Sequence, residues 1–252
     1  MNRIFPTVVA LLTTSAMVAT GLQAQDQPED PDRWKGEVGL SVNGSGGNER
    51  LTVITGQLGL AHLETNRYEL DFNGRARYGR SEGVEVARSV RGSLSAEFRP
   101  AARLSPFLSG TAEHDRFRRV DLRMNTGAGF KHTFWREGWS DVSLSGALLY
   151  WYEQLARDDS DGPTHTARWS WRGRARHRLD SGARLEQTVF YQPTWERLDD
   201  YVLEAQTTVR LALSQSLSLN SSFLYQRDST PAPEVAPDDW SIAVGLSLAT
   251  TW

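Results

Sequence analysis

The sequence predicts an all-β protein: a twelve-stranded, antiparallel, up-and-down transmembrane β-barrel with short periplasmic turns and longer outer loops. The first observation is strict alternation of apolar with small or polar residues near the C-terminus, which indicates a strand with one apolar face. The apolar set is Trp240, Ile242, Val244, Leu246 and Leu248. The second observation is the final residue, Trp252, which places an aromatic ring at the membrane interface if this strand closes a barrel.

The third observation is an N-terminal export signal. Asn2 and Arg3 precede an apolar run from Ile4 to Leu22, and cleavage is expected after Ala24. The chain is therefore divided into a signal peptide over 1–24, an acidic, proline-containing periplasmic leader over 25–33, and a barrel over 34–252. A retained membrane anchor is the alternative interpretation of the first segment.

Composition limits the class of protein further. The formal net charge of −3 becomes −4 when Arg3 is removed with the signal, a mild value that suggests no nucleic-acid partner. The chain has no Cys, so an exported protein of this sequence has no disulfide framework. The mean hydropathy of −0.49 fits a barrel, because half of each strand can be polar.

Alternation of the same kind repeats along the chain and predicts each strand in turn. The apolar faces span 34–42, 54–60, 68–78, 84–98, 104–112, 120–130, 142–152, 167–175, 185–195, 201–213, 217–225 and 240–248. Connections after even-numbered strands are short, as at Asp180–Gly182. Connections after odd-numbered strands tend to be longer, as at Gln154–Thr164. This asymmetry predicts short turns in the periplasm, long loops outside the cell and both termini in the periplasm.

Alternation alone does not say which face points inward, because a soluble barrel of the lipocalin type alternates with its apolar face inside. The aromatic strand ends and the export signal favour lipid outside, in the outer membrane of a Gram-negative bacterium. Expected partners are outer-membrane lipids, lipopolysaccharide and the barrel-assembly machinery. The expected girdle residues are Trp34, Tyr68, Tyr78, Trp169, Trp171, Trp240 and Trp252. The expected lumen-lining residues are Glu69, Asp71, Arg75, Arg77, Arg168, Arg172, Arg174, Arg176 and Arg178.

Several short motifs occur in an order that resembles a known family. They are Ser45 to Asn48, Arg123 to Phe130, Gly146 to Glu153, Tyr191 to Pro193, and Asp228 to Pro231 followed by Asp239. In this order they resemble the YdiY-like, salt-induced outer-membrane protein family, domain of unknown function 481, over nearly the whole mature chain. An extra Gly between Ser45 and Asn48 departs from the family pattern. The resemblance implies an outer-membrane barrel and brings no catalytic residues.

The row of Arg residues from Arg168 to Arg178 is the sharpest chemical feature. Five of its six inward positions are Arg. The neighbouring strand that precedes the row presents the small residues Ser143, Ser145 and Ala147, so the positive charge of the row is not wholly neutralised by that strand. Carboxylates on strands roughly opposite would create a transverse field across a wet lumen. The sequence therefore predicts a narrow channel for small polar or anionic solutes. The alternative is a non-conducting, structural or envelope-stress barrel filled by Arg–carboxylate pairs.

The sequence gives little support for a catalytic site or a metal-binding site. The loop Asp158–Gly162 resembles a calcium loop, but Arg157 occupies the position of the first ligand. His114 and Asp115 lie at an outer loop, yet no nucleophile can be assigned to them. No catalytic residue, cofactor or metal is expected, and a surface hydrolase is kept as a second alternative.

Overall fold

A computed structural model describes residues 33–45, 51–64, 67–117, 119–156, 162–179, 181–231 and 237–251. The predicted signal peptide, most of the predicted leader, all of the calcium-like loop except Gly162, and Trp252 lie outside the described residues. Twelve strands are present: β1 (Arg33–Ser45), β2 (Leu51–Glu64), β3 (Tyr68–Ser81), β4 (Val84–Phe98), β5 (Leu104–Asp115), β6 (Val120–Glu137), β7 (Ser140–Leu155), β8 (Thr164–Arg178), β9 (Arg184–Pro193), β10 (Tyr201–Ala212), β11 (Leu217–Asp228) and β12 (Asp238–Thr251). The first strand includes Arg33, which the sequence assigned to the leader.

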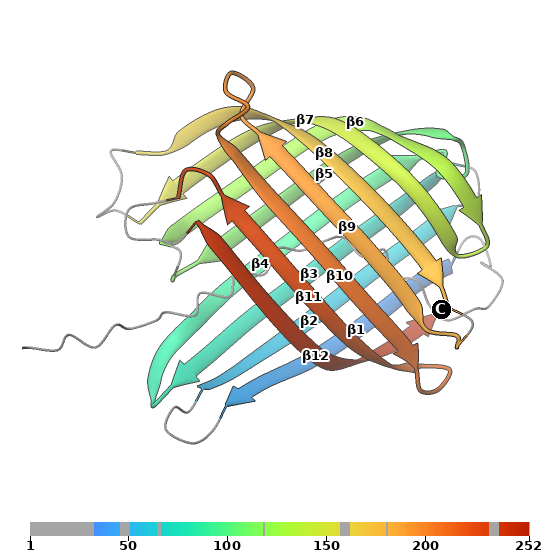
Figure 1. The fold of residues 1–252 in the computed structure, drawn as a ribbon, viewed down its shortest axis with the longest axis horizontal. Coiled ribbons are helices and arrows are strands. Elements are labelled where there is room, and N and C mark those ends of the chain that lie inside the picture. Colours follow the sequence, from blue (N-terminus) through green and yellow to red (C-terminus); the bar gives the residue numbers. More distant parts are fainter. Residues whose placement is uncertain are drawn as a thin grey trace, which may run out of the picture.

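The strands form one closed antiparallel barrel in which each strand pairs with its neighbours in the chain. Closure comes from β1 and β12, which pair from Lys35↔Thr251 to Ser41↔Gly245. Figure 1 shows the strands running diagonally around the barrel, so that strands of the near and far walls cross in projection. The predicted fold and strand number are confirmed. The seam pairs 35–41 of β1 with 245–251 of β12, and a sheet in lipid requires its backbone groups to be paired in this way.

The two ends of the barrel differ in their connections. We call the end that carries the connections after even strands the turn end, and the opposite end the loop end. No connection at the turn end exceeds five residues, whereas eight residues separate β7 from β8 and nine separate β11 from β12. The β3–β4 connection is an exception at the loop end, because Glu82 and Gly83 form a two-residue turn with φ of 51° and 84°. Positive φ at both positions is the backbone of a type I′ hairpin.

The outer face of the barrel is apolar and accessible. Val38, Leu40, Val90, Phe130 and Leu248 each expose more than half of their surface. Such a continuous apolar surface needs a covering phase, and lipid provides it for a barrel of this class. One outward assignment was wrong: Val120 is only 1% exposed. The register of β6 shifts between Val120 and Leu122, and this bulge changes the parity of the strand.

Some strands approach each other closely enough to require Gly. A Cβ on Gly245 of β12 would lie 2.7 Å from the Cβ of Ser41 on β1, at the closing seam. A Cβ on Gly129 of β6 would lie 2.7 Å from the Cβ of Ala147 on β7. No helix within the described ranges is long and apolar enough to cross a membrane.

The structure places the predicted girdle residues as follows. Trp34, Tyr78, Trp171 and Trp240 are exposed, whereas Tyr68 and Trp169 are half-buried by neighbouring rings. Trp34 stacks on His62 with ring centroids 4.9 Å apart near the turn end. Trp169 stacks on Trp195 with ring centroids 4.5 Å apart, and this pair lies nearer the loop end. Trp195 follows β9 rather than belonging to it, because the strand ends at Pro193, which has no N–H for the ladder.

Candidate functional site: the barrel lumen

The barrel encloses a cavity of about 610 Å³. Residues from both ends of the barrel line it: Pro100 and Trp139 from the turn end, and Asp228 and Thr230 from the loop end. Eight cationic residues and seven acidic residues also line it. These residues are Arg91, Arg123, Lys131, Arg136, Arg168, Arg172, Arg174 and Arg176, and Glu69, Asp71, Glu97, Glu113, Glu153, Glu204 and Asp228. The lumen is therefore polar and nearly balanced in charge.

The Arg row on β8 lies along this cavity for most of its length. Arg168, Arg172, Arg174 and Arg176 line the cavity. Arg178 does not: it is exposed at the turn end, where its backbone N–H donates to the Ser140 hydroxyl over 3.1 Å. Because the row follows one face of a single strand, successive side chains are spaced about 6.6 Å apart.

The strand beside the row carries a counter-charge that the sequence argument missed. Asp141 of β7 is fully buried, and its Oδ1 accepts a hydrogen bond from Arg176 Nε over 2.6 Å. Its Oδ2 accepts from Arg176 Nη2 at 3.1 Å and from Arg174 Nη2 at 3.3 Å. Asp141 of β7 therefore neutralises part of the row, at the turn end of the barrel. The parity that Asp141 shares with Ser143 was the signal that could have identified it.

The opposite wall carries the predicted acidic residues. Glu69 and Asp71 of β3 line the cavity, whereas Arg75 and Arg77, farther along the same face of β3, do not. Glu97 of β4 forms an ion pair with Lys131 of β6. Elsewhere on the inner surface, Arg210 of β10 reaches Glu37 of β1 with an N–O distance of 2.8 Å. Arg–carboxylate pairs thus join several walls of the barrel.

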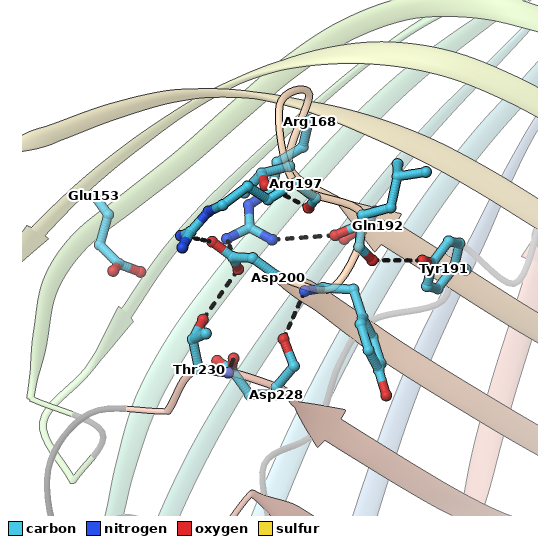
Figure 2. Close-up of polar contacts among 12 residues, drawn as sticks. Glu153, Arg168, Tyr191, Gln192, Arg197, Asp200, Asp228 and Thr230 are labelled. Carbon is cyan, nitrogen blue, oxygen red and sulfur yellow. Dashed lines mark hydrogen bonds and ion pairs between the residues drawn. The ribbon is translucent and has the colours of Figure 1, made fainter.

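Asp200, in the connection between β9 and β10, organises the loop-end mouth (Figure 2). Its carboxylate accepts from Arg197 over 3.0 Å, from the Thr230 hydroxyl over 3.0 Å and from Arg168 over 3.4 Å. Arg168 also donates to the backbone carbonyl of Gln192. The 194–200 connection is therefore tied both to β8 and to the segment that follows β11. Sequence reasoning did not identify Asp200, because Arg168 and Thr230, which it joins, are distant from it in the chain.

Aromatic rings accompany the lumen cations at three levels. Trp151 lies 5.5 Å from the Arg123 guanidinium and 5.2 Å from that of Arg168. Phe107 and Phe190 lie 5.8 and 5.9 Å from the guanidinium of Arg172. At the turn end, Trp139 lies 5.4 Å from Arg176 and 5.3 Å from Arg184. Contacts of this kind contribute roughly 0.5–2 kcal/mol each and restrict long side chains that could otherwise move freely in the lumen.

Several buried polar atoms of the interior have no protein hydrogen-bond partner among the described residues. They include Asp71 Oδ1, Arg91 Nε, Arg168 Nε, Arg174 Nε and Glu204 Oε1. A buried polar group without a hydrogen bond costs about 1–3 kcal/mol. Groups of this kind gathered along a polar cavity favour an interior that water enters, because water can satisfy them.

His114 and Asp115, at the connection between β5 and β6, both contact backbone groups of that hairpin. The ring of His114 forms a hydrogen bond between Nδ1 and the backbone carbonyl of Asp121, and Asp115 accepts from the backbone N–H of Phe117. Both contacts shape the hairpin between β5 and β6. Within the described part of the chain, no group of three metal-ligating side chains comes together.

Comparisons with known proteins agree with this geometry. Residues 38–249 match the family model described as "Protein of unknown function, DUF481". No curated protein matches the chain. Solved structures of similar fold include the translocator domain of the autotransporter NalP from Neisseria meningitidis (11% identity, 89% of this chain and 90% of that one, TM-score 0.51). They also include the COG4313 outer membrane channel from Pseudomonas putida F1 (13% identity, 90% of this chain and 100% of that one, TM-score 0.50). The NanC porin is a third (10% identity, 85% of this chain and 98% of that one, TM-score 0.50).

Proposed function

Since the chain belongs to the DUF481 family and has the fold of outer-membrane barrels such as porins and channels, we propose that it is a narrow passage for small polar or anionic solutes. Solutes would move passively down their gradients through the lumen. This proposal assigns the protein no catalytic step, no cofactor and no metal.

The cavity that reaches residues of both barrel ends carries the proposal. Its lining is charged, and several of its polar atoms need water, so a hydrated solute would meet polar groups along its path. The Arg residues on β8 would raise the local concentration of anions beside that wall. The small cavity volume restricts passage to small solutes.

A non-conducting structural barrel is the second candidate, and one observation favours it. Ion pairs lie along the lumen at different levels, among them Arg123–Glu153, Lys131–Glu97 and Arg91–Glu113. A sufficiently dense network of such pairs would fill a small lumen and stabilise the barrel without conducting. The two candidates therefore differ in whether solvent passes between the pairs.

Swelling of proteoliposomes distinguishes the two. Vesicles that contain the folded barrel are diluted into isosmotic solutions of glycine, arabinose, glucose or raffinose, and the rate of swelling is recorded by light scattering. A passage of this size should admit glycine and exclude raffinose, while empty vesicles should not swell. Rates equal to those of empty vesicles for every solute would support the structural barrel instead.

We further propose the cellular placement. Residues 1–24 act as the export signal, and the barrel-assembly machinery inserts the chain so that the loop end faces outside. The exposed apolar belt contacts lipid, and lipopolysaccharide surrounds the loop end. Signal cleavage after Ala24 is checked by mass determination of the mature protein from outer membranes.

A further inference from the structure

Arg172, near the middle of β8, differs from its neighbours in the Arg row because its charge is not paired. Arg168 pairs with Asp200, and Arg174 and Arg176 pair with Asp141. By contrast, Arg172 Nη2 donates to the Ser145 hydroxyl over 3.2 Å, and no carboxylate of the described residues lies within ion-pair distance of its guanidinium. The group keeps N–H donors for a solute in the cavity that it lines.

Asp71 of β3 is the acidic counterpart. Its side chain is buried and lines the same cavity, and its Oδ1 has no hydrogen-bond partner among the described residues. Within the described chain it also has no ion-pair partner. In the ring of twelve strands, four strands separate β3 from β8 on one side and six on the other, so the two groups lie on nearly opposite walls.

Arg172 and Asp71 line the same cavity from two walls and form no ion pair with each other. The open cavity lies between them, since both side chains line it. We propose that they form a binding site for small zwitterions of the amino-acid class: Arg172 binds the carboxylate of the solute and Asp71 binds its ammonium group. This inference deepens the proposed passage and rests on one part of it, that a solute can reach the middle of the lumen from at least one end.

Charge balance favours a zwitterion over a simple ion at this site. A free anion at Arg172 would be attracted by Arg174 as well but repelled by Glu97, Glu186 and Asp71. A free cation at Asp71 would be attracted by Glu69 and Glu97 as well but repelled by Arg174 and Arg172. A solute that carries both charges satisfies both walls at once. The rings of Phe107 and Phe190 beside Arg172 lower the local polarity, which strengthens these interactions relative to bulk water.

Titration of the folded barrel in detergent, followed by NMR signals of the solute, measures this binding without requiring conduction. The probes are β-alanine, γ-aminobutyrate and 5-aminovalerate, which separate their charges by increasing distances. Pentanoate and pentylammonium are single-charge controls of matched length. We expect one zwitterion to bind roughly ten- to hundredfold more tightly than either control, the range for losing one hydrogen bond to a charged group.

Binding to single variants tests which protein group contacts which end of the solute. Asp71→Asn should weaken zwitterion binding at least tenfold without weakening pentanoate binding, and Arg172→Gln should weaken zwitterion binding without weakening pentylammonium binding. The exchange of both charges, Asp71→Arg with Arg172→Asp, should restore zwitterion binding in the reversed orientation. Heat-modifiable migration on gels verifies that each variant is folded. If the double variant does not fold, the two single variants test the proposed site by themselves.

Equal binding of zwitterions and single-charge controls would overturn the inference, as would unchanged zwitterion binding in the folded Asp71→Asn variant. The outcome is separable from that of the swelling assay. Vesicles that swell in glycine while no zwitterion binds selectively would retain the passage and refute the site. Selective binding without swelling would retain the site and refute the passage.

Discussion

Asp141 provides the sharpest test of how the lumen charges stabilise the barrel. The change Asp141→Asn keeps the shape of the side chain but removes its charge. The native carboxylate forms a bidentate pair with Arg176, with distances of 2.6 and 3.1 Å, and also contacts Arg174 at 3.3 Å. In the variant two neighbouring guanidinium groups would remain beside a neutral amide, without their counter-charge.

The expected loss of stability is large for a conservative change. Removal of one partner from a buried ion pair costs roughly 3–5 kcal/mol. The Asp141 side chain is 0% exposed, but both Arg side chains retain 12% exposure and can be partly hydrated. We therefore expect about 3 kcal/mol, the lower end of that range. A double-mutant cycle with Arg176→Gln should give a coupling energy of roughly 1–3 kcal/mol.

The assay is urea-induced unfolding of the barrel in lipid vesicles, followed by tryptophan fluorescence. Ser143→Ala is the matched control, because Ser143 is buried on the same face of β7, two residues along. Its loss should stay below about 1 kcal/mol. An Asp141→Asn variant as stable as Ser143→Ala would refute the argument that this pair stabilises the barrel.

Three further changes test the architecture. Gly129→Val should lower the urea midpoint strongly, because even a Cβ at this position would lie 2.7 Å from the Cβ of Ala147; an unchanged midpoint would contradict the close approach of β6 and β7. Deletion of 249–252 removes the backbone pairs of 249–251 with 35–37 and should prevent heat-modifiable barrel from accumulating in outer membranes, whereas normal amounts would show that the seam closes without them. An epitope inserted in the connection Gln154–Thr164 should be labelled on intact cells, and labelling only after the outer membrane is opened would reverse the proposed orientation.

The strands were predictable because one face of each must be apolar. The alternation in β12, from Trp240 to Leu248, depends only on the local two-residue period and on lipid outside. The structure differs from the predicted strands where the backbone no longer follows the two-residue period. The bulge in β6 buried Val120, and Pro193, which has no N–H for the ladder, ended β9 before Trp195.

The charge pairs of the lumen were less predictable than the strands. Parity identified Arg172 and Asp71 as inward residues, and both line the cavity. Parity does not give the relative height of residues on tilted strands that are far apart in the chain. The pairing of Arg168 with Asp200 depends on the course of the 194–200 connection, for which the sequence offers no periodic signal.

Single-channel recording in planar bilayers tests the central claim, that the lumen is a polar passage, most directly. Insertion of the purified, heat-modifiable barrel should produce discrete conductance steps, small in size because the cavity is only about 610 Å³. The steps should persist in 1 M salt, where charges more than about 3 Å apart are screened from one another, because an open passage conducts whether or not the charges of its wall are screened. A barrel that inserts fully folded and leaves the bilayer current at its baseline would contradict the passage and favour a lumen filled by its ion pairs.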